Sequence, residues 1–241
     1  MSDPTRTSQS TRHATDPAAA AARTPAAAVA PTIRRPRAAA FRALLAAAAL
    51  TGLLLAALGS PSPAHLLTRF TVQANLAVAL VSACSAHRAW TGRRPVSPRI
   101  TGALLPFLAL PALAHYALPA DTTAFTLPEA GTPTAARVIA PQLLYVLTPL
   151  ATLADWLLLT GPRGFRLSCA WQWPAYPLLH LAFALAFPAA AGAPPPTVAT
   201  ALTLALAICL LPLITIGIDQ VRPAPRLHNN RISPQGIGPL K

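Results

Sequence analysis

Six runs of apolar residues, separated by short stretches rich in polar residues and proline, dominate the pattern along this chain. The runs cover residues 38–58, 70–89, 100–118, 139–160, 169–187 and 198–218. Each is close to the roughly 20 residues that a helix needs to cross about 30 Å of hydrocarbon. A helix also satisfies its own backbone hydrogen bonds where water is absent. The pattern therefore predicts an all-α, polytopic membrane protein with six transmembrane helices.

Polar residues and prolines interrupt the second and fifth runs. The interrupting residues are Gln73 and Asn75 in the second run, and Gln172, Pro174, Pro177 and His180 in the fifth. Proline is tolerated inside a spanning helix where neighbouring groups satisfy the carbonyl that it frees. We expect both segments to remain helical, with kinks in the fifth.

The Lys and Arg residues predict the orientation of the six helices. In a six-helix arrangement all but two of the 19 basic residues, Arg69 and Arg137, fall on one side of the membrane. The positive-inside rule assigns that side to the cytoplasm, so both termini are expected there. If one of the six spans were absent, the basic residues after it would fall on the opposite side, and this one-sided distribution would be lost.

The chain divides into three parts on this interpretation. Residues 1–36 lack apolar periodicity and are predicted to be a disordered cytoplasmic tail, residues 37–219 form the membrane bundle, and residues 220–241 form a cytoplasmic C-terminal tail. A cleaved signal peptide is not expected, because the polar segment before the first apolar run is too long for its charged region and the run itself is too long for its apolar region. An Arg-rich targeting segment at the N-terminus is the alternative.

Composition excludes several classes of function. Hydrophobic residues make up 54% of the chain and charged residues 10%, against roughly 25% charged residues in soluble domains. The net charge of +13 is divided among short clusters between apolar runs, so we expect membrane lipids as partners and no nucleic acid. The three cysteines lack metal-ligand spacing, and no cofactor or metal is predicted. The abundance of Arg over Lys suggests a high-GC bacterium, and the predicted location is its cytoplasmic membrane.

The fourth run, LLYVLTPLATLADWLLLT, contains an acid where an acid is costly. At about 100° per residue its polar side chains fall within an arc of about 80°. These are Tyr145, Thr148, Thr152 and Asp155. We expect Asp155 to be paired with Gln172, with a tryptophan N–H or Arg163 as alternatives. A role in proton relay is another interpretation of the same acid.

Two further helices carry polar stripes. The second run has Thr68, Thr71, Asn75, Ser82 and Ser85 on one arc, and the fifth has Gln172, Tyr176 and His180 at spacings of four. Such side chains commonly form hydrogen bonds between helices, each of which stabilises the bundle by about 0.6 kcal/mol. The alternative is that they line a functional site. With the termini inside, Thr71, His115 and Tyr145 all lie in the outer half of the bilayer. For His115 an interfacial position is the plainer interpretation, and for His180 a hydrogen bond to a neighbour.

Three segments resemble the bacterial branch of the androgen-inducible integral membrane protein family. They are FTVQAN at 70–75, LLYVLTPLATLADWLLL at 143–159 and WPAYPLLHLAFAL at 173–185. The resemblance implies a six-helix bundle. Eukaryotic members are intramembrane hydrolases of fatty acid esters of hydroxy fatty acids, with a threonine nucleophile that corresponds to Thr71. Their histidine would fall where this chain has Tyr145, and their aromatic-proline motif after the fifth helix is replaced by an Ala, Gly and Pro loop.

Two functional hypotheses follow. The first is a non-catalytic or regulatory membrane protein. The alternative is an intramembrane hydrolase of lipid acyl esters, with Thr71 as nucleophile, His115 as substitute base and Tyr145 as hydrogen-bond donor to the oxyanion. A threonine hydroxyl needs such a base within hydrogen-bond reach, and a neutral tyrosine can donate but cannot act as the base at neutral pH.

The predicted orientation can be tested by labelling single cysteines in intact cells, after the three native cysteines have been replaced. An impermeant thiol reagent should modify cysteines placed between residues 122 and 134, because that loop is predicted to be outside. It should spare cysteines placed between residues 88 and 99. The opposite pattern would refute the orientation.

Overall fold

The computed structural model describes residues 34–60, 62–118, 124–127, 134–191 and 195–223, and all of their regular elements are helices. The long helices are α2 (Pro36–Gly59), α4 (Phe70–Trp90), α5 (Pro98–Ala117), α8 (Cys169–Ala186) and α10 (Val198–Val221). The fourth predicted segment is a continuous run of α6 (Ala135–Pro141), η2 (Gln142–Leu147), α7 (Thr148–Ala154) and η3 (Asp155–Leu159), where η marks a π-helix. Short helices α3 (Pro63–Leu66) and α9 (Pro188–Ala191) complete the set.

All six predicted segments are helical, and the helix ends lie within four residues of the predicted ends. Five of them are long and apolar enough to cross a membrane: α2, α4, α5, the run from α6 to η3, and α10. The remaining helix, α8, has sufficient length, but the polar residues and prolines of its first half lower its hydropathy. The described residues therefore confirm an all-helical, polytopic membrane protein. The predicted tails fall almost wholly outside the described residues, although α10 continues two residues past the predicted boundary at 219.

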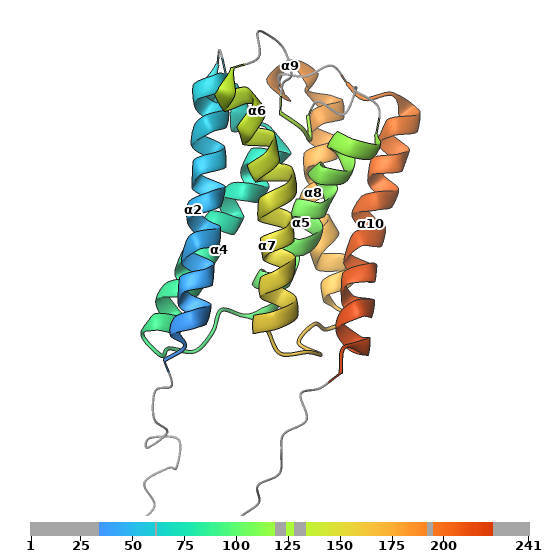
Figure 1. The fold of residues 1–241 in the computed structure, drawn as a ribbon. Helices are drawn as coiled ribbons and strands as arrows, with labels where there is room; N and C mark the ends of the chain where they lie inside the picture. Colours follow the sequence, from blue (N-terminus) through green and yellow to red (C-terminus); the bar gives the residue numbers. More distant parts are fainter. Residues whose placement is uncertain (1–33, 61, 119–123, 128–133, 192–194, 224–241) are drawn as a thin grey trace, which may run out of the picture. The chain divides into compact units, whose positions relative to one another are not determined.

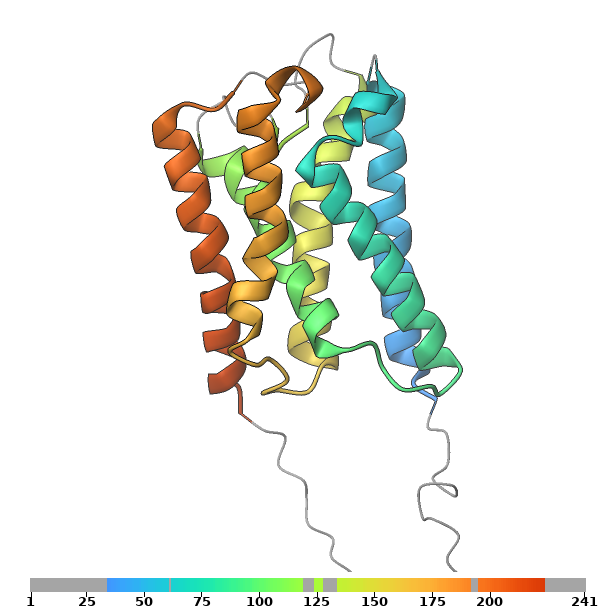
Figure 2. The ribbon, with the colours of Figure 1, turned by 180° about the vertical axis from the view of Figure 1, so that it is seen from behind.

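The helices pack as a bundle in which α5 is central (Figure 1). Helix α2 packs against α4 and against α6 and η2, while α5 packs against α4, α7, α8 and α10. Helices α8 and α10 pack together on the far side of α5 from α2, as the view from behind shows (Figure 2). The start of α2 and the end of α10 lie at the same end of the bundle, which we call the terminal end (Figure 1).

The outer surface of this bundle is unusually apolar. Large side chains such as Leu44, Leu158 and Leu202 are each more than 65% exposed. In a soluble domain an apolar surface this extensive would favour aggregation, whereas lipid tails solvate it. The exposed leucines therefore agree with helices that cross a membrane.

The fourth segment is not the uniform α-helix that its sequence suggests. Pro141 and Pro149 each lack the backbone N–H that an α-helix needs. The π-helix η2 begins directly after Pro141 and ends two residues before Pro149. The Thr148 hydroxyl lies 2.8 Å from the Leu143 carbonyl and 3.1 Å from the Leu144 carbonyl, so it can satisfy either acceptor. Wider turns of this kind often occur at functional sites.

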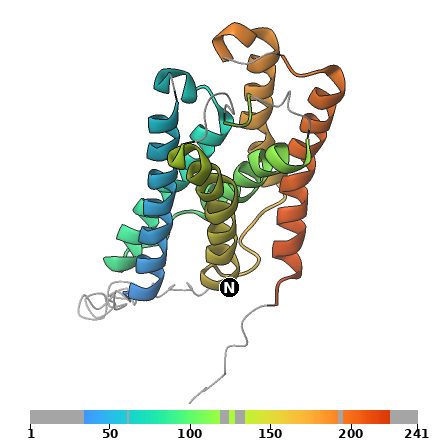
Figure 3. The same cartoon turned by 45° about the horizontal axis from the view of Figure 1, so that its top comes forward.

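The loop between α5 and α6 folds back into the bundle. Its described residues, 124–127, are all buried. This end of the bundle, opposite the terminal end, we call the loop end. Seen with that end turned forward, the adjoining ends of α5 and α6 lie between α2 and α10 (Figure 3). Sequence reasoning predicted only a short external loop here.

Close packing of α5 gives the first structural prediction. A Cβ atom on Gly102 would lie 2.5 Å from Phe165 Cε1 and 2.8 Å from Trp173 Cη2, and both belong to rigid rings. Gly217, on α10, has open space at the same position. We expect Gly102→Ala to lower the melting temperature in detergent, because overpacking costs about 1–3 kcal/mol.

Gly217→Ala is the matched control, and it should leave the melting temperature unchanged or raise it, since alanine favours helix. Equal stability of the two variants would contradict this packing.

Candidate functional site

A polar network at the loop end joins α4 to the fourth segment. Thr71 and Asn75 lie one turn apart on α4 and are fully buried. Asn75 Nδ2 donates to the Thr71 carbonyl at 2.9 Å. The side-chain oxygen of Asn75, Oδ1, accepts from the Thr148 hydroxyl at 2.8 Å. The Thr152 hydroxyl in turn donates to the Thr148 carbonyl at 2.7 Å. These contacts satisfy polar groups that lie beyond the reach of water.

The same network holds the buried loop. The Thr71 hydroxyl donates to the Phe125 carbonyl, and the Leu127 N–H donates to Tyr145 Oη at 2.6 Å. The Phe70 N–H donates to the Ala124 carbonyl at 3.1 Å. His180 Nε2, on α8, lies 3.3 Å from that carbonyl oxygen. Backbone groups of a buried loop need such partners, because an unpaired one costs as much as a lost hydrogen bond.

The three residues predicted for a hydrolase site converge at this end. Thr71 Oγ1 lies 3.5 Å from Tyr145 Oη. The ring of His115, on α5, stacks on the Tyr145 ring with centroids 4.3 Å apart and planes 17° apart. Three helices, α4, α5 and η2, thus bring together residues that are up to 74 positions apart in the sequence.

The orientation of His115 bears on its chemistry. The lone pair of an imidazole nitrogen lies in the ring plane, so a face-to-face stack does not direct it at the stacked ring. The Thr71 hydroxyl gives its proton to a backbone carbonyl, which is not a base. The arrangement therefore supports a hydrogen-bonded anchor more directly than an activated nucleophile.

Arg69 adds a positive charge that sequence reasoning treated only as a topology signal. It precedes α4 and is 6% exposed. Burial lowers the pKa of its guanidinium, and the Coulombic interaction with Tyr145 opposes that shift. An arginine keeps its charge at neutral pH, so a buried positive charge lies at the start of α4.

Asp155 is paired, but with a partner other than the one expected. Arg42 Nε lies 2.7 Å from Asp155 Oδ1, and the two side chains are 14% and 16% exposed. Gln172 is exposed on α8, which packs against α5 and α10. Arg163, an alternative partner, donates from Nε to the Gln220 carbonyl at 3.4 Å. The sequence did not predict this pairing, because Arg42 is 113 positions away from Asp155 and was used only as one of the basic residues that indicate the cytoplasmic side.

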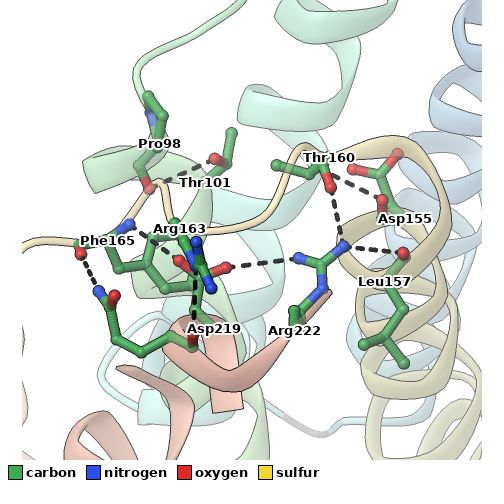
Figure 4. Close-up of polar contacts among 10 residues, drawn as sticks. Pro98, Thr101, Asp155, Leu157, Thr160, Arg163, Phe165, Asp219 and Arg222 are labelled. Atoms are coloured by element: carbon green, nitrogen blue, oxygen red, sulfur yellow. Dashed lines mark hydrogen bonds and ion pairs between the residues drawn. The ribbon is translucent and has the colours of Figure 1, made fainter. Parts of the chain in front are cut away.

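A second ion pair closes the terminal end (Figure 4). Asp219 is fully buried, and its carboxylate accepts from the Phe165 N–H at 3.0 Å and from Arg222 Nη1 at 3.4 Å. Arg222 Nη2 donates to the carbonyls of Leu157 and Thr160, both at 2.8 Å. These carbonyls at the end of η3 have no partner within their helix. Arg222 therefore joins the end of α10 to the end of the fourth segment.

The predicted polar stripes differ in burial. On α4, Thr71, Asn75, Ser82 and Ser85 are all buried, so this stripe faces the interior. On α8 the stripe divides, because His180 is buried while Gln172 and Tyr176 are exposed. Tyr176 still joins α8 to α4, since its hydroxyl donates to Gln73 Oε1 at 2.6 Å.

In the described part of the chain, no three His, Cys, Asp or Glu side chains are gathered as a metal site would need. Searches of family models, of curated proteins and of solved structures found no match to the chain. The family resemblance therefore stays a prediction.

The Arg42–Asp155 pair can be tested by a double-mutant cycle. Asp155→Leu and Arg42→Met should each lower the free energy of unfolding by on the order of 3 kcal/mol, or less where water reaches the pair, because each leaves one charge uncompensated. The double variant should lose less than the sum of the two.

Melting temperature and folded yield in detergent measure these effects. Gln172→Leu is the control and should leave both unchanged, since Gln172 is exposed. Strictly additive losses in the cycle would show that the two side chains do not interact.

Proposed function

We propose that this protein is a six-span membrane protein of the bacterial cytoplasmic membrane, with both termini in the cytoplasm, that acts without catalysis. The loop end then faces outward, and residues 124–127 are buried within it. A regulatory or scaffolding role suits a bundle in which the polar groups of that end bond with one another and with this loop.

One observation carries the non-catalytic proposal. Thr71 is fully buried, and its hydroxyl donates to the Phe125 carbonyl. A nucleophilic hydroxyl must instead give its proton to a base and remain open to the substrate. Here the hydroxyl is committed to holding the loop.

The six-span orientation is supported by the arrangement of the helix ends. The start of α2, the end of α4, the segment between η3 and α8, and the end of α10 lie at the terminal end (Figure 1). These segments carry or adjoin the basic residues Arg35, Arg88, Arg166 and Arg222. With α8 taken as a span, successive long helices run in alternating directions. The distribution of basic residues then follows the positive-inside rule.

The second candidate is a hydrolase of lipid acyl esters, and the convergence of Thr71, Tyr145 and His115 favours it. In that role Thr71 Oγ would attack the ester carbonyl, and the Tyr145 hydroxyl would donate to the oxyanion. The positive charge of Arg69 would stabilise the negative charge that develops there. The loop at 124–127 would have to move to admit a substrate.

A fluorophosphonate probe separates the two candidates, because it reacts covalently with activated hydroxyl nucleophiles. The purified, folded protein should remain unlabelled if Thr71 is an anchor. Thr71→Ala and His115→Ala should likewise show no labelling. Thr71→Ser, which keeps the hydroxyl, should retain the melting temperature that Thr71→Ala loses.

Labelling of the wild type that disappears in folded Thr71→Ala and His115→Ala would overturn the non-catalytic proposal and establish the hydrolase.

A further inference from the structure

A small polar cavity lies between α2, α4, α5 and the end of the fourth segment, toward the terminal end. Its volume is about 20 Å³. The polar side chains that line it include Arg42, Ser82, Ser85, Thr152, Asp155 and Trp156. The cavity adjoins the loop-end network at Thr152, and neither Thr71, His115 nor Tyr145 lines it.

Two buried atoms in its wall have no hydrogen-bond partner among the described residues. They are Ser85 Oγ and Trp156 Nε1, on side chains of residues that are each 5% exposed. Buried polar groups nearly always have a partner, which is a protein atom or an ordered water. Their presence in the wall of one cavity points to a ligand that bonds with both.

The size of the cavity limits that ligand. A water molecule needs about 10–15 Å³ by this measure, together with two to four polar partners. A volume of about 20 Å³ therefore suits one or two waters and is too small for a phosphate or a lipid headgroup.

The charge in the wall also favours a neutral ligand. Arg42 and Asp155 form an ion pair, so their charges compensate each other. The Trp156 N–H can only donate, the Asp155 carboxylate can only accept, and the Ser85 hydroxyl can do both. The ligand must thus both accept and donate hydrogen bonds, as water does.

We propose that this cavity is a hydration site that binds one or two ordered water molecules. The water accepts from Trp156 Nε1, bonds with the Ser85 hydroxyl and donates to the Asp155 carboxylate. The Arg42–Asp155 pair is thereby solvated inside the bundle, which reduces the desolvation cost of burying two charges. A bound water also makes this region of α4 accessible to species of similar size.

Silver ion, which is small enough to follow water, tests this accessibility. Ser85→Cys is introduced after Cys84, Cys169 and Cys209 have been replaced, and Ala86→Cys serves as the control. Ala86 lies at the same depth on α4 and is also buried, but does not line the cavity. Because thiols react as thiolates, which form in water, Ser85→Cys should react with Ag⁺ roughly tenfold faster than the control.

A bulky methanethiosulfonate reagent should leave Ser85→Cys unmodified, because the cavity admits only water-sized species. Equal rates of reaction with Ag⁺ at the two positions would overturn the proposal. Modification by the bulky reagent would also overturn it, since it would indicate a wide crevice.

Thermal stability provides a second measurement that does not depend on the cysteine variants. If Ser85 bonds to water, Ser85→Ala should lower the melting temperature, because the water loses a partner. If the cavity is dry, the same change removes an unsatisfied hydroxyl and the melting temperature should be unchanged or higher. That second result would refute the hydration site.

Discussion

The burial of residues 124–127 imposes the strongest constraint on the loop end of this bundle. A loop that enters a helical bundle takes its carbonyl and N–H groups away from water, and each then needs a partner. Thr71, Tyr145 and the backbone of Phe70 supply those partners. Because Asn75 and Thr148 in turn connect α4 to the fourth segment, the loop and two helices are held by one set of hydrogen bonds.

The terminal end is held by charge instead. Arg42 on α2 reaches Asp155, and Arg222 on α10 reaches Asp219 and the last carbonyls of η3. Two helices from opposite sides of the bundle are thus attached to the end of the same segment. The Arg222 guanidinium also lies 4.8 Å from the centre of the Trp156 ring, a favourable cation–π position. Trp156 therefore lies between the Arg42–Asp155 pair and the Arg222–Asp219 pair.

The loop-end network illustrates how a structural anchor and a catalytic site can use the same residue types. A hydroxyl, a phenol and an imidazole in one apolar region are what an acyl-transfer site needs. Their chemistry depends on where the hydroxyl proton is directed and on which part of the imidazole faces it. Here the Thr71 proton goes to a backbone carbonyl, and the face of the His115 ring stacks on Tyr145. These contacts are the ones on which the proposed anchoring role rests.

The sequence alone determined the helices. Apolar run length and periodicity are local properties, and they located six helices to within a few residues of α2, α4, α5, the fourth segment, α8 and α10. The cost of an acid in an apolar segment is also local, so the need of Asp155 for a partner could be predicted. The depth of Thr71, His115 and Tyr145 followed from the alternation of helix directions, and depth was enough to group them.

Only the tertiary structure decided which side chains meet. Arg42 rather than Gln172 pairs with Asp155 because α2 packs against the end of the fourth segment, while the Gln172 side chain is exposed on α8. The burial of residues 124–127, the contacts of Arg222 with the end of η3 and the polar cavity beside Ser85 likewise depend on which helices adjoin. In a bundle whose outer surface is apolar, a polar stripe identifies the interior face of a helix, as it does for α4, but it carries no information about which neighbouring helix covers that face.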